Sequence, residues 1–264
     1  MLTLENITKT FAKGTVNEKT ALAGVDLHLN KGDFVTVLGS NGAGKSTLFG
    51  AIAGTFQPDT GRVILDGQDI TTLPDFKRSK FIGRLFQDPL KGTAPNMTIE
   101  ENLALAYMRA SSHTSPFSRI SKADRADFRE RLAQLELGLE DRMDHSVGLL
   151  SGGQRQALTL LMATLVTPKL LLLDEHTAAL DPGTAQKVLA LTEKIVRDNG
   201  ITCLMITHNV SSALELGNRT IMMNNGRICL ALSGDTRQNM TTEELLKAFH
   251  RQGMDNDRIL FSAE

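Results

Sequence analysis

The chain has 264 residues, of which 41% are hydrophobic and 22% are charged, a balance typical of one globular domain, with or without an inserted lobe. The formal net charge of −1 gives no electrostatic argument for nucleic acid or an acidic membrane surface as a partner. The longest uncharged apolar run, residues 157–166, is too short to span a bilayer.

The N-terminus lacks the basic and apolar segments of a secretory signal. Cys203 and Cys229 are the only cysteines, and each lies in an apolar run typical of a strand. Two isolated cysteines make neither a disulfide framework nor a zinc site, so we expect buried, reduced thiols. These features favour a soluble cytosolic protein whose role at a membrane, if it has one, depends on a partner.

The first third of the chain is typical of β-hairpins followed by a strand, a glycine-rich loop and a helix. The predicted strands cover residues 2–9, 21–29, 34–38 and 62–65, with turns at residues 30–32 and 66–67 and a helix over residues 47–53.

Residues 96–165 are mainly helical by pattern. Thr98 and Glu101 resemble a capping box ahead of the apolar residues that follow. A serine-rich stretch, residues 111–121, predicts an exposed loop, and helices are expected over residues 122–135 and 154–166.

After Pro168 the alternation of strands and helices returns. The predicted elements are strands over residues 170–174 and 201–207, a helix from Asp181-Pro182 to near Gly200, a hairpin of residues 220–224 and 227–232 about Asn225-Gly226, and a short helix over residues 241–250. This alternation predicts an α/β fold with a parallel sheet. We expect an α/β core with an antiparallel β-subdomain (residues 1–89 and 166–235), an inserted helical subdomain (90–165) and a short C-terminal extension (236–264).

A complete phosphate-binding pattern, GxxxxGK[ST], lies between the apolar strand and the first helix and reads Gly39-Ser40-Asn41-Gly42-Ala43-Gly44-Lys45-Ser46. Its glycines let backbone N–H groups turn toward phosphate oxygens, and the following helix, with Thr47 in its first turn, adds its positive end. Lys45 would reach the β- and γ-phosphates, and Ser46 would offer its hydroxyl to Mg²⁺. The alternative is a chance glycine-rich turn. The pattern predicts a P-loop NTPase (RecA-like) core and leaves kinases, GTPases, helicases and transport motors open.

The segment Leu150-Ser151-Gly152-Gly153-Gln154 resembles the signature of the ABC (ATP-binding cassette) ATPases. Ser151 suits an N-cap, and the two glycines would expose N–H groups at a helix start, which makes a second anion site; a simple helix cap is the alternative. One chain seldom needs two such sites for one nucleotide. In that family the second site serves a partner subunit, so the resemblance implies that Ser151, Gly152, Gly153 and Gln154 complete the ATP site of a second chain.

The buried strand of residues 170–174 delivers two adjacent carboxylates, Asp174 and Glu175, to the edge where α/β sheets bind ligands. They resemble the family's Walker B pair, which implies that Asp174 holds Mg²⁺ and that Glu175 is the general base; an acidic helix cap is the alternative.

Four further positions match family motifs in order, over a resemblance that spans roughly residues 1–235. Gln87 resembles the Q-loop glutamine, a Mg²⁺ ligand at the entry to the helical lobe. His208 resembles the switch histidine that contacts the γ-phosphate, although an isolated histidine is more often structural. Asp181 resembles the D-loop and also suits an N-cap. Phe11 resembles the aromatic residue that stacks on adenine, although a phenylalanine near a strand end is more often part of the core.

Two departures from the family pattern stand out. His176 follows Glu175 where proline is commoner, which we interpret as neutral drift in a turn, with tuning of the pKa of Glu175 as the alternative. The helix after the signature reads RQALTLLMA, whereas the commoner family pattern has several arginines. The segment after Gln87 resembles a bacterial importer branch whose permeases are akin to amino-acid permeases.

The resemblance implies an ATPase that closes head to tail around two ATP with Mg²⁺, with a second copy or a homologous ATPase subunit. It would act at the cytoplasmic side of the membrane on separate transmembrane permease subunits, with an extracytoplasmic solute-binding protein and without nucleic acid, to import a small amino-acid-like solute. The alternatives are a soluble non-transport ABC ATPase (in repair, translation or assembly) and a non-catalytic nucleotide-binding regulator.

Overall fold

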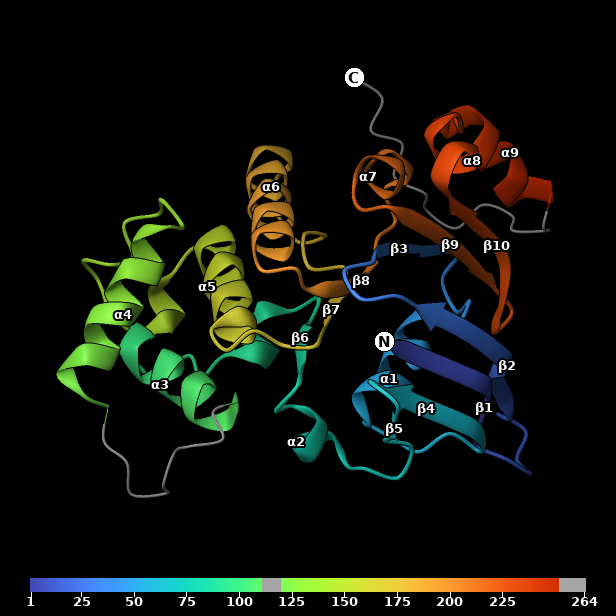
Figure 1. Ribbon diagram of the computed structural model, residues 1–264, viewed down its shortest axis with the longest axis horizontal. Helices are drawn as coiled ribbons and strands as arrows, with labels where there is room; N and C mark the ends of the chain where they lie inside the picture. Colours follow the sequence, from blue (N-terminus) through green and yellow to red (C-terminus); the bar gives the residue numbers. More distant parts are fainter. Residues whose placement is uncertain (111–119, 252–264) are drawn as a thin grey trace. The chain divides into compact units, whose positions relative to one another are not determined.

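The computed structural model of the chain describes residues 1–110 and 120–251 (Figure 1). The chain forms two compact units: unit 1 comprises Met1–Arg78 with Thr202–Glu264, and unit 2 comprises Ser79–Ile201. Most of the loop predicted over residues 111–121 and the last part of the predicted C-terminal extension lie outside the described residues. Among the residues described, no helix combines the length and the apolar character that crossing a bilayer requires.

Unit 1 contains both β-rich parts of the chain. Its elements are β1 (Leu2–Phe11), β2 (Lys19–Leu29), β3 (Phe34–Gly39), α1 (Lys45–Ala53), β4 (Thr60–Leu65), β5 (Gln68–Asp69), α2 (Asp75–Arg78), β8 (Thr202–Ile206), α7 (Val210–Glu215), β9 (Arg219–Asn224), β10 (Arg227–Ser233), α8 (Gly234–Gln238) and α9 (Thr242–Arg251).

Two sheets organise unit 1. The first is antiparallel, in the order β2-β1-β4-β5, and confirms the predicted N-terminal β-subdomain. In the second, β3 pairs in parallel with β8 on one side and with β9 on the other, and β10 adds an antiparallel edge strand beside β9. All six residues of β3 are buried, which is the pattern of a strand in the middle of a sheet that is covered on both faces.

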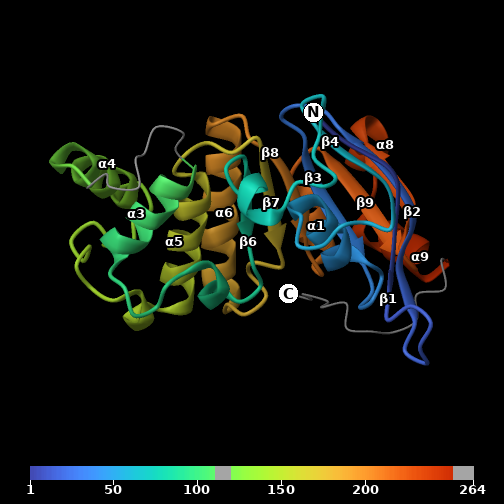
Figure 2. The same ribbon diagram turned by 90° about the horizontal axis from the view of Figure 1, so that it is seen from below.

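Unit 2 contains two parallel strands, β6 and β7, and most of the long helices. Its elements are β6 (Ile82–Leu85), η1 (Pro89–Gly92), α3 (Ile99–Ala110), α4 (Lys122–Ala133), η2 (Val147–Leu149), α5 (Gly152–Thr164), β7 (Leu170–Asp174) and α6 (Pro182–Asp198). Both ribbon views show α3, α5 and α6 in a row within this unit (Figures 1 and 2).

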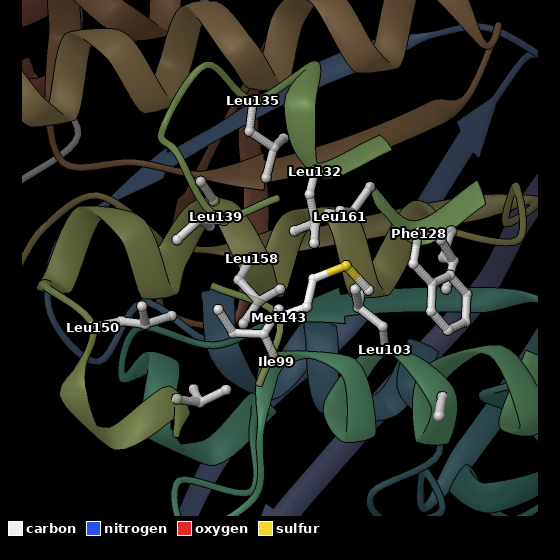
Figure 3. Close-up of a cluster of buried hydrophobic side chains, with 14 residues drawn as sticks. Ile99, Leu103, Phe128, Leu132, Leu135, Leu139, Met143, Leu150, Leu158 and Leu161 are labelled. Carbon is white, nitrogen blue, oxygen red and sulfur yellow. The ribbon is translucent and has the colours of Figure 1, made fainter. Parts of the chain in front are cut away.

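The helices of unit 2 share one apolar core, whose side chains converge from several elements (Figure 3). Ile99 and Leu103 come from α3, Phe128 and Leu132 from α4, and Leu158 from α5, and each of these side chains is completely buried. The helical middle of the chain is therefore held together by burial of apolar surface, the dominant favourable contribution to folding.

The α/β class and the long elements agree with the sequence-based prediction, and the capping box at the start of α3 is present. The N–H of Thr98 donates to Glu101 Oε2 (2.8 Å), and the N–H of Glu101 donates to Thr98 Oγ1 (3.2 Å). Helix α1 starts at Lys45 and α5 at Gly152, each two residues earlier than predicted. The short elements β5, α2, β6, α7 and α8 had not been predicted.

The thiols differ from the expectation in one respect. Both cysteines are free, and Cys203 is buried in β8 as expected. Cys229 in β10 is only half-buried, so the expectation of a buried thiol is wrong for this residue. It lies on β10, the edge strand of this sheet in the part of the chain that the structure describes.

Arg78 has the largest fully buried side chain of the described residues, and its guanidinium caps the end of α1. Nη1 donates to the carbonyls of Ala51 (2.9 Å) and Ile52 (2.8 Å) in the last turn of α1, and Nε donates to Leu73 O (2.6 Å). The last carbonyls of a helix have no partner within the helix, and a cation at that end also favours the helix dipole. Burial lowers the pKa of Arg78 to about 10, so the guanidinium remains charged at neutral pH.

We expect Arg78→Met to lower the free energy of unfolding by about 3 kcal/mol, because several buried carbonyls then lose their donor. Arg78→Lys should cost less, since an ammonium keeps the charge but lacks the planar fork that reaches several acceptors. Urea-induced unfolding of the wild type and both variants measures this difference. Equal stability of wild type and Arg78→Met would show that the cap contributes nothing.

Candidate functional site

The phosphate loop of unit 1 has the backbone that its glycines predict. Gly39, Gly42 and Gly44 have φ values of 154°, 80° and 102°, which L-residues with a side chain rarely adopt. Lys45 is nearly buried, and its Nζ donates to the carbonyls of Gly39 (2.7 Å) and Ser40 (3.1 Å). Asn41, Gly42 and Ser46 are exposed, while Ser40 and Thr47 are half-buried. The loop therefore offers polar groups at the start of α1, where N–H groups are available to an anion.

The turn between β9 and β10 anchors this loop, a contact that the sequence did not indicate. The N–H of Gly226 donates to Ala43 O (3.0 Å), and the N–H of Ala23 in β2 donates to Gly226 O (2.9 Å). A Cβ at Gly226 would lie 2.7 Å from Ala21 O, and a Cβ at Gly44 would lie 2.5 Å from the same oxygen. Both glycines are thus required by close backbone approach as well as by φ. The Asn-Gly pair had been recognised only as a hairpin turn.

His208 lies beside the start of the phosphate loop. Strands β3 and β8 are parallel with Val37 opposite Ile206, and the N–H of Thr207 donates to Val37 O (3.2 Å). Two residues beyond this pair come Gly39 on one strand and His208 on the other. His208 is half-buried. The sheet therefore brings this histidine to the same edge as the phosphate loop.

Phe11 is not a core residue, because 41% of its surface is exposed at the end of β1. Its ring packs edge to face against Phe56, with centroids 5.4 Å apart and an interplanar angle of 82°. Lys9 Nζ lies 5.8 Å from the Phe11 centroid and 5.4 Å from that of Phe56, within cation–π range. The ring of Phe11 is thus supported from one side and partly open to solvent.

In unit 2 the ends of β6 and β7 bring Gln87 and the two acidic residues to one sheet edge. These strands are parallel with Leu85 opposite Leu173, so Gln87 follows the end of β6 where Asp174 and Glu175 follow the paired residue of β7. Asp174 and Glu175 are half-buried, and Gln87 is exposed. Glu175 has a φ of 48°, in the left-handed region, which turns the chain out of the strand.

The signature segment starts α5 with a complete capping box, which confirms Ser151 as the N-cap. Ser151 Oγ accepts the N–H of Gln154 (3.2 Å), and Gln154 Oε1 accepts the N–H of Ser151 (3.1 Å). A Cβ at Gly153 would collide with the methyl group of Thr184 in α6, so this glycine permits close packing of the two helices. Asp181 caps α6 in turn, since its carboxylate accepts the N–H of Thr184 (3.0 Å).

His176 is a buried structural residue. Its side chain is 3% exposed, and Nε2 lies 3.1 Å from Thr192 Oγ1 in α6. Burial lowers the pKa of His176 to about 4, so the imidazole is neutral near pH 7. The position after Glu175 thus carries a specific side-chain contact, and Thr192 is a further residue near the site that the sequence did not indicate.

Comparison with known proteins identifies the family. The family model described as ABC transporter matches residues 22–178 of the chain. A protein of Clostridioides difficile (strain R20291) named "Tyrosine transport ATP-binding protein" is 41% identical over 249 residues, which cover 94% of this chain and 98% of that protein. The chain belongs to the ABC transporter family. It is an ABC-type ATPase, as the phosphate loop and the signature together predicted.

More distant relatives agree with this assignment. A spermidine/putrescine import ATP-binding protein of Mesoplasma florum is 33% identical over 86% of this chain, which spans 60% of that relative's length. A solved dimeric ATP-binding cassette in a post-hydrolysis state, bound to ADP and phosphate, is similar with a TM-score of 0.75 and 30% identity. The alignment covers 88% of this chain and 98% of that one. The P-loop NTPase core of an ABC ATPase is therefore the fold of this chain.

The donor groups of this ABC ATPase suit Mg²⁺. Ser46 offers a hydroxyl, Gln87 an amide oxygen and Asp174 a carboxylate, and Mg²⁺ prefers such oxygen ligands. Over residues 1–110 and 120–251, no cluster of three or more His, Cys, Asp or Glu residues could hold a metal ion by itself.

We expect Gly226→Ala to weaken ATP binding at least tenfold, because a Cβ would push the turn away from Ala21 and disturb the hydrogen bond to Ala43. Gly67→Ala is the matched control, since Gly67 also has a positive φ (77°) in an Asp-Gly turn but meets nothing within 4 Å. Both variants carry the backbone strain of about 1 kcal/mol, and only the first touches the phosphate loop. Titration with a fluorescent ATP analogue measures the affinity, and equal affinities of the two variants would contradict the anchoring role.

Proposed function

We propose that the chain dimerises head to tail around two ATP molecules and drives a solute through separate membrane permease subunits. The observation that carries the proposal is the presence of two glycine-bearing helix starts in one chain, at Gly44 before α1 and at Ser151 before α5. One bound nucleotide needs one such helix N-terminus, so the second N-terminus is available to a nucleotide bound by another chain. The partner is a second copy or a homologous ATPase subunit.

Each nucleotide is held in this proposal by groups from both chains. Residues 39–47 of one chain bind the phosphates, and residues 151–154 of the other chain close over them. Phe11 stacks on adenine, which suits its half-exposed ring and the support it receives from Phe56. Closure thereby assembles donors around the γ-phosphate that neither chain supplies alone.

Hydrolysis in this proposal depends on Glu175 and His208, each of which follows a strand. Glu175 takes the proton of the attacking water as general base, and His208 contacts the γ-phosphate and orients that water. Ser46, Gln87 and Asp174 hold Mg²⁺, which neutralises charge on the phosphates when it is bound. The loss of one bridging nucleotide then opens the dimer, and the helical subdomain (90–165), linked through Gln87, passes the movement to the permease.

The proposed cargo is a small amino-acid-like solute, taken up from outside with the help of an extracytoplasmic solute-binding protein. The support is the name of the Clostridioides difficile relative, a tyrosine transport ATP-binding protein that this chain matches over nearly its whole length. The ATPase would work as a peripheral subunit at the cytoplasmic face of the cell membrane.

We expect Glu175→Gln to lower ATP turnover at least a hundredfold and to accumulate an ATP-bound dimer, since the amide cannot accept the proton of water. Phosphate release measures turnover, and size-exclusion chromatography with ATP and Mg²⁺ measures the dimer. Lys45→Ala is the control, because it should lose both hydrolysis and the dimer through failure to bind ATP. Near-normal hydrolysis by Glu175→Gln would exclude Glu175 as the base.

We expect the tagged wild-type chain, purified from detergent-solubilised membranes of its own cell, to bring a membrane permease with it. Mass spectrometry of the complex identifies the permease. A soluble protein or a nucleic acid in its place would contradict the transport role and favour a non-transport ABC ATPase.

A further inference from the structure

The backbone at Glu175 is in a conformation that the residue does not favour by itself. A φ of 48° brings the Cβ of an L-residue close to backbone oxygen, which costs about 1–2 kcal/mol. Such a conformation persists only where the surrounding structure imposes it. The contacts of the residues next to Glu175 therefore decide where its carboxylate points.

The next side chain, His176, is the buried anchor of this turn. Thr192 Oγ1 donates its single hydrogen to Val188 O (2.8 Å), so it can only accept from His176, and the imidazole must carry its hydrogen on Nε2. His176 is 3% exposed and Thr192 1%, so water does not compete for the bond. A buried donor that lost this acceptor would remain unsatisfied, which makes the pairing specific.

The rest of the turn is closed by a hydrogen bond of its own and leads into α6. The N–H of Ala178 donates to Glu175 O (3.0 Å), and Asp181 caps the first turn of α6. His176 meets α6 again at Thr192, about three helical turns beyond that cap. The turn that carries Glu175 is thus fastened to α6 at two separate points, the cap and the His176–Thr192 bond.

We infer that His176 is a positioning residue that holds the Glu175 turn in its left-handed conformation through its hydrogen bond to Thr192 Oγ1. The inference rests on the proposed role of Glu175 as general base. Both side chains of the bond are buried, so we expect it to act on the rate of the chemical step and not on ATP binding. A displacement of the carboxylate by about 1 Å is enough to lower the rate strongly.

The test is steady-state hydrolysis by Thr192→Val, which keeps the shape of the side chain and removes the acceptor. We expect kcat to fall about tenfold while the KM for ATP stays within about twofold of wild type. Thr192→Ser keeps the hydroxyl and should restore kcat to within about twofold. His176→Phe keeps a buried ring without the donor and should lower kcat as Thr192→Val does, so it also serves if Thr192→Val yields little folded protein.

A matched control separates this effect from general loss of packing. Thr164 in α5 is also buried, and its hydroxyl donates to Leu160 O (2.8 Å) four residues earlier, as that of Thr192 does to Val188. Thr164→Val should leave kcat within about twofold of wild type. Thr192→Val in the His176→Phe background should lower kcat no further, because the bond is already absent.

Three results would overturn the inference: an unchanged kcat in Thr192→Val, a failure of Thr192→Ser to restore it, or an equal loss in Thr164→Val. The variant Glu175→Gln distinguishes a failure of the positioning role from a failure of the base assignment. If Glu175→Gln abolishes hydrolysis while Thr192→Val is normal, the positioning role fails and the base remains. If Glu175→Gln hydrolyses ATP normally, the proposed role of Glu175 as general base fails, and the inference fails with it.

Discussion

The hydrogen bond from Gly226 N–H to Ala43 O is the contact on which unit 1 depends for its phosphate loop. Helix α1 begins without a side-chain cap, because its N-cap position is Gly44, which has no polar side chain. The loop therefore takes its shape from backbone contacts with the β9–β10 turn and with β2, together with the hydrogen bonds from Lys45 Nζ to the carbonyls of Gly39 and Ser40. Both neighbours approach so closely that only glycine fits at residues 44 and 226. The position of the start of α1, the end of a helix that suits an anion, follows from that packing.

In unit 2, residues that suit a nucleotide site also hold the helices together. Ser151 and Gln154 cap α5 through their own side chains, and Gly153 lets α5 approach Thr184 of α6. Helix α6 in turn receives the cap of Asp181 and the side chain of His176. The acidic strand end and the signature segment therefore both pack against α6.

His176 illustrates how a departure from a family pattern acquires a physical meaning. From the sequence, His176 was interpreted as neutral drift in a turn, with tuning of the pKa of Glu175 as the alternative. Burial keeps the imidazole neutral at ordinary pH, so it adds no charge beside Glu175. Its geometry gives it a directional bond to Thr192, which a proline at this position would lack.

The sequence by itself determined the motifs and the longer elements, which are local along the chain. The phosphate loop, the signature, the capping residues Thr98, Ser151 and Asp181, and the apolar strands β3, β7 and β8 were all predicted, because each depends on residues within about one helical turn or on the period of a strand. The short elements were missed, since a helix of one or two turns carries too little pattern and is stabilised by its neighbours.

The tertiary structure alone decided which distant segments meet. It placed the ends of β3 and β8 at one sheet edge and the ends of β6 and β7 at one sheet edge, and it set Arg78 against the carboxyl end of α1 and the Asn225-Gly226 turn against the phosphate loop. These contacts follow from strand register and from close packing between residues far apart in the chain. No local propensity encodes them, because the free energy that selects them comes from burying whole elements together.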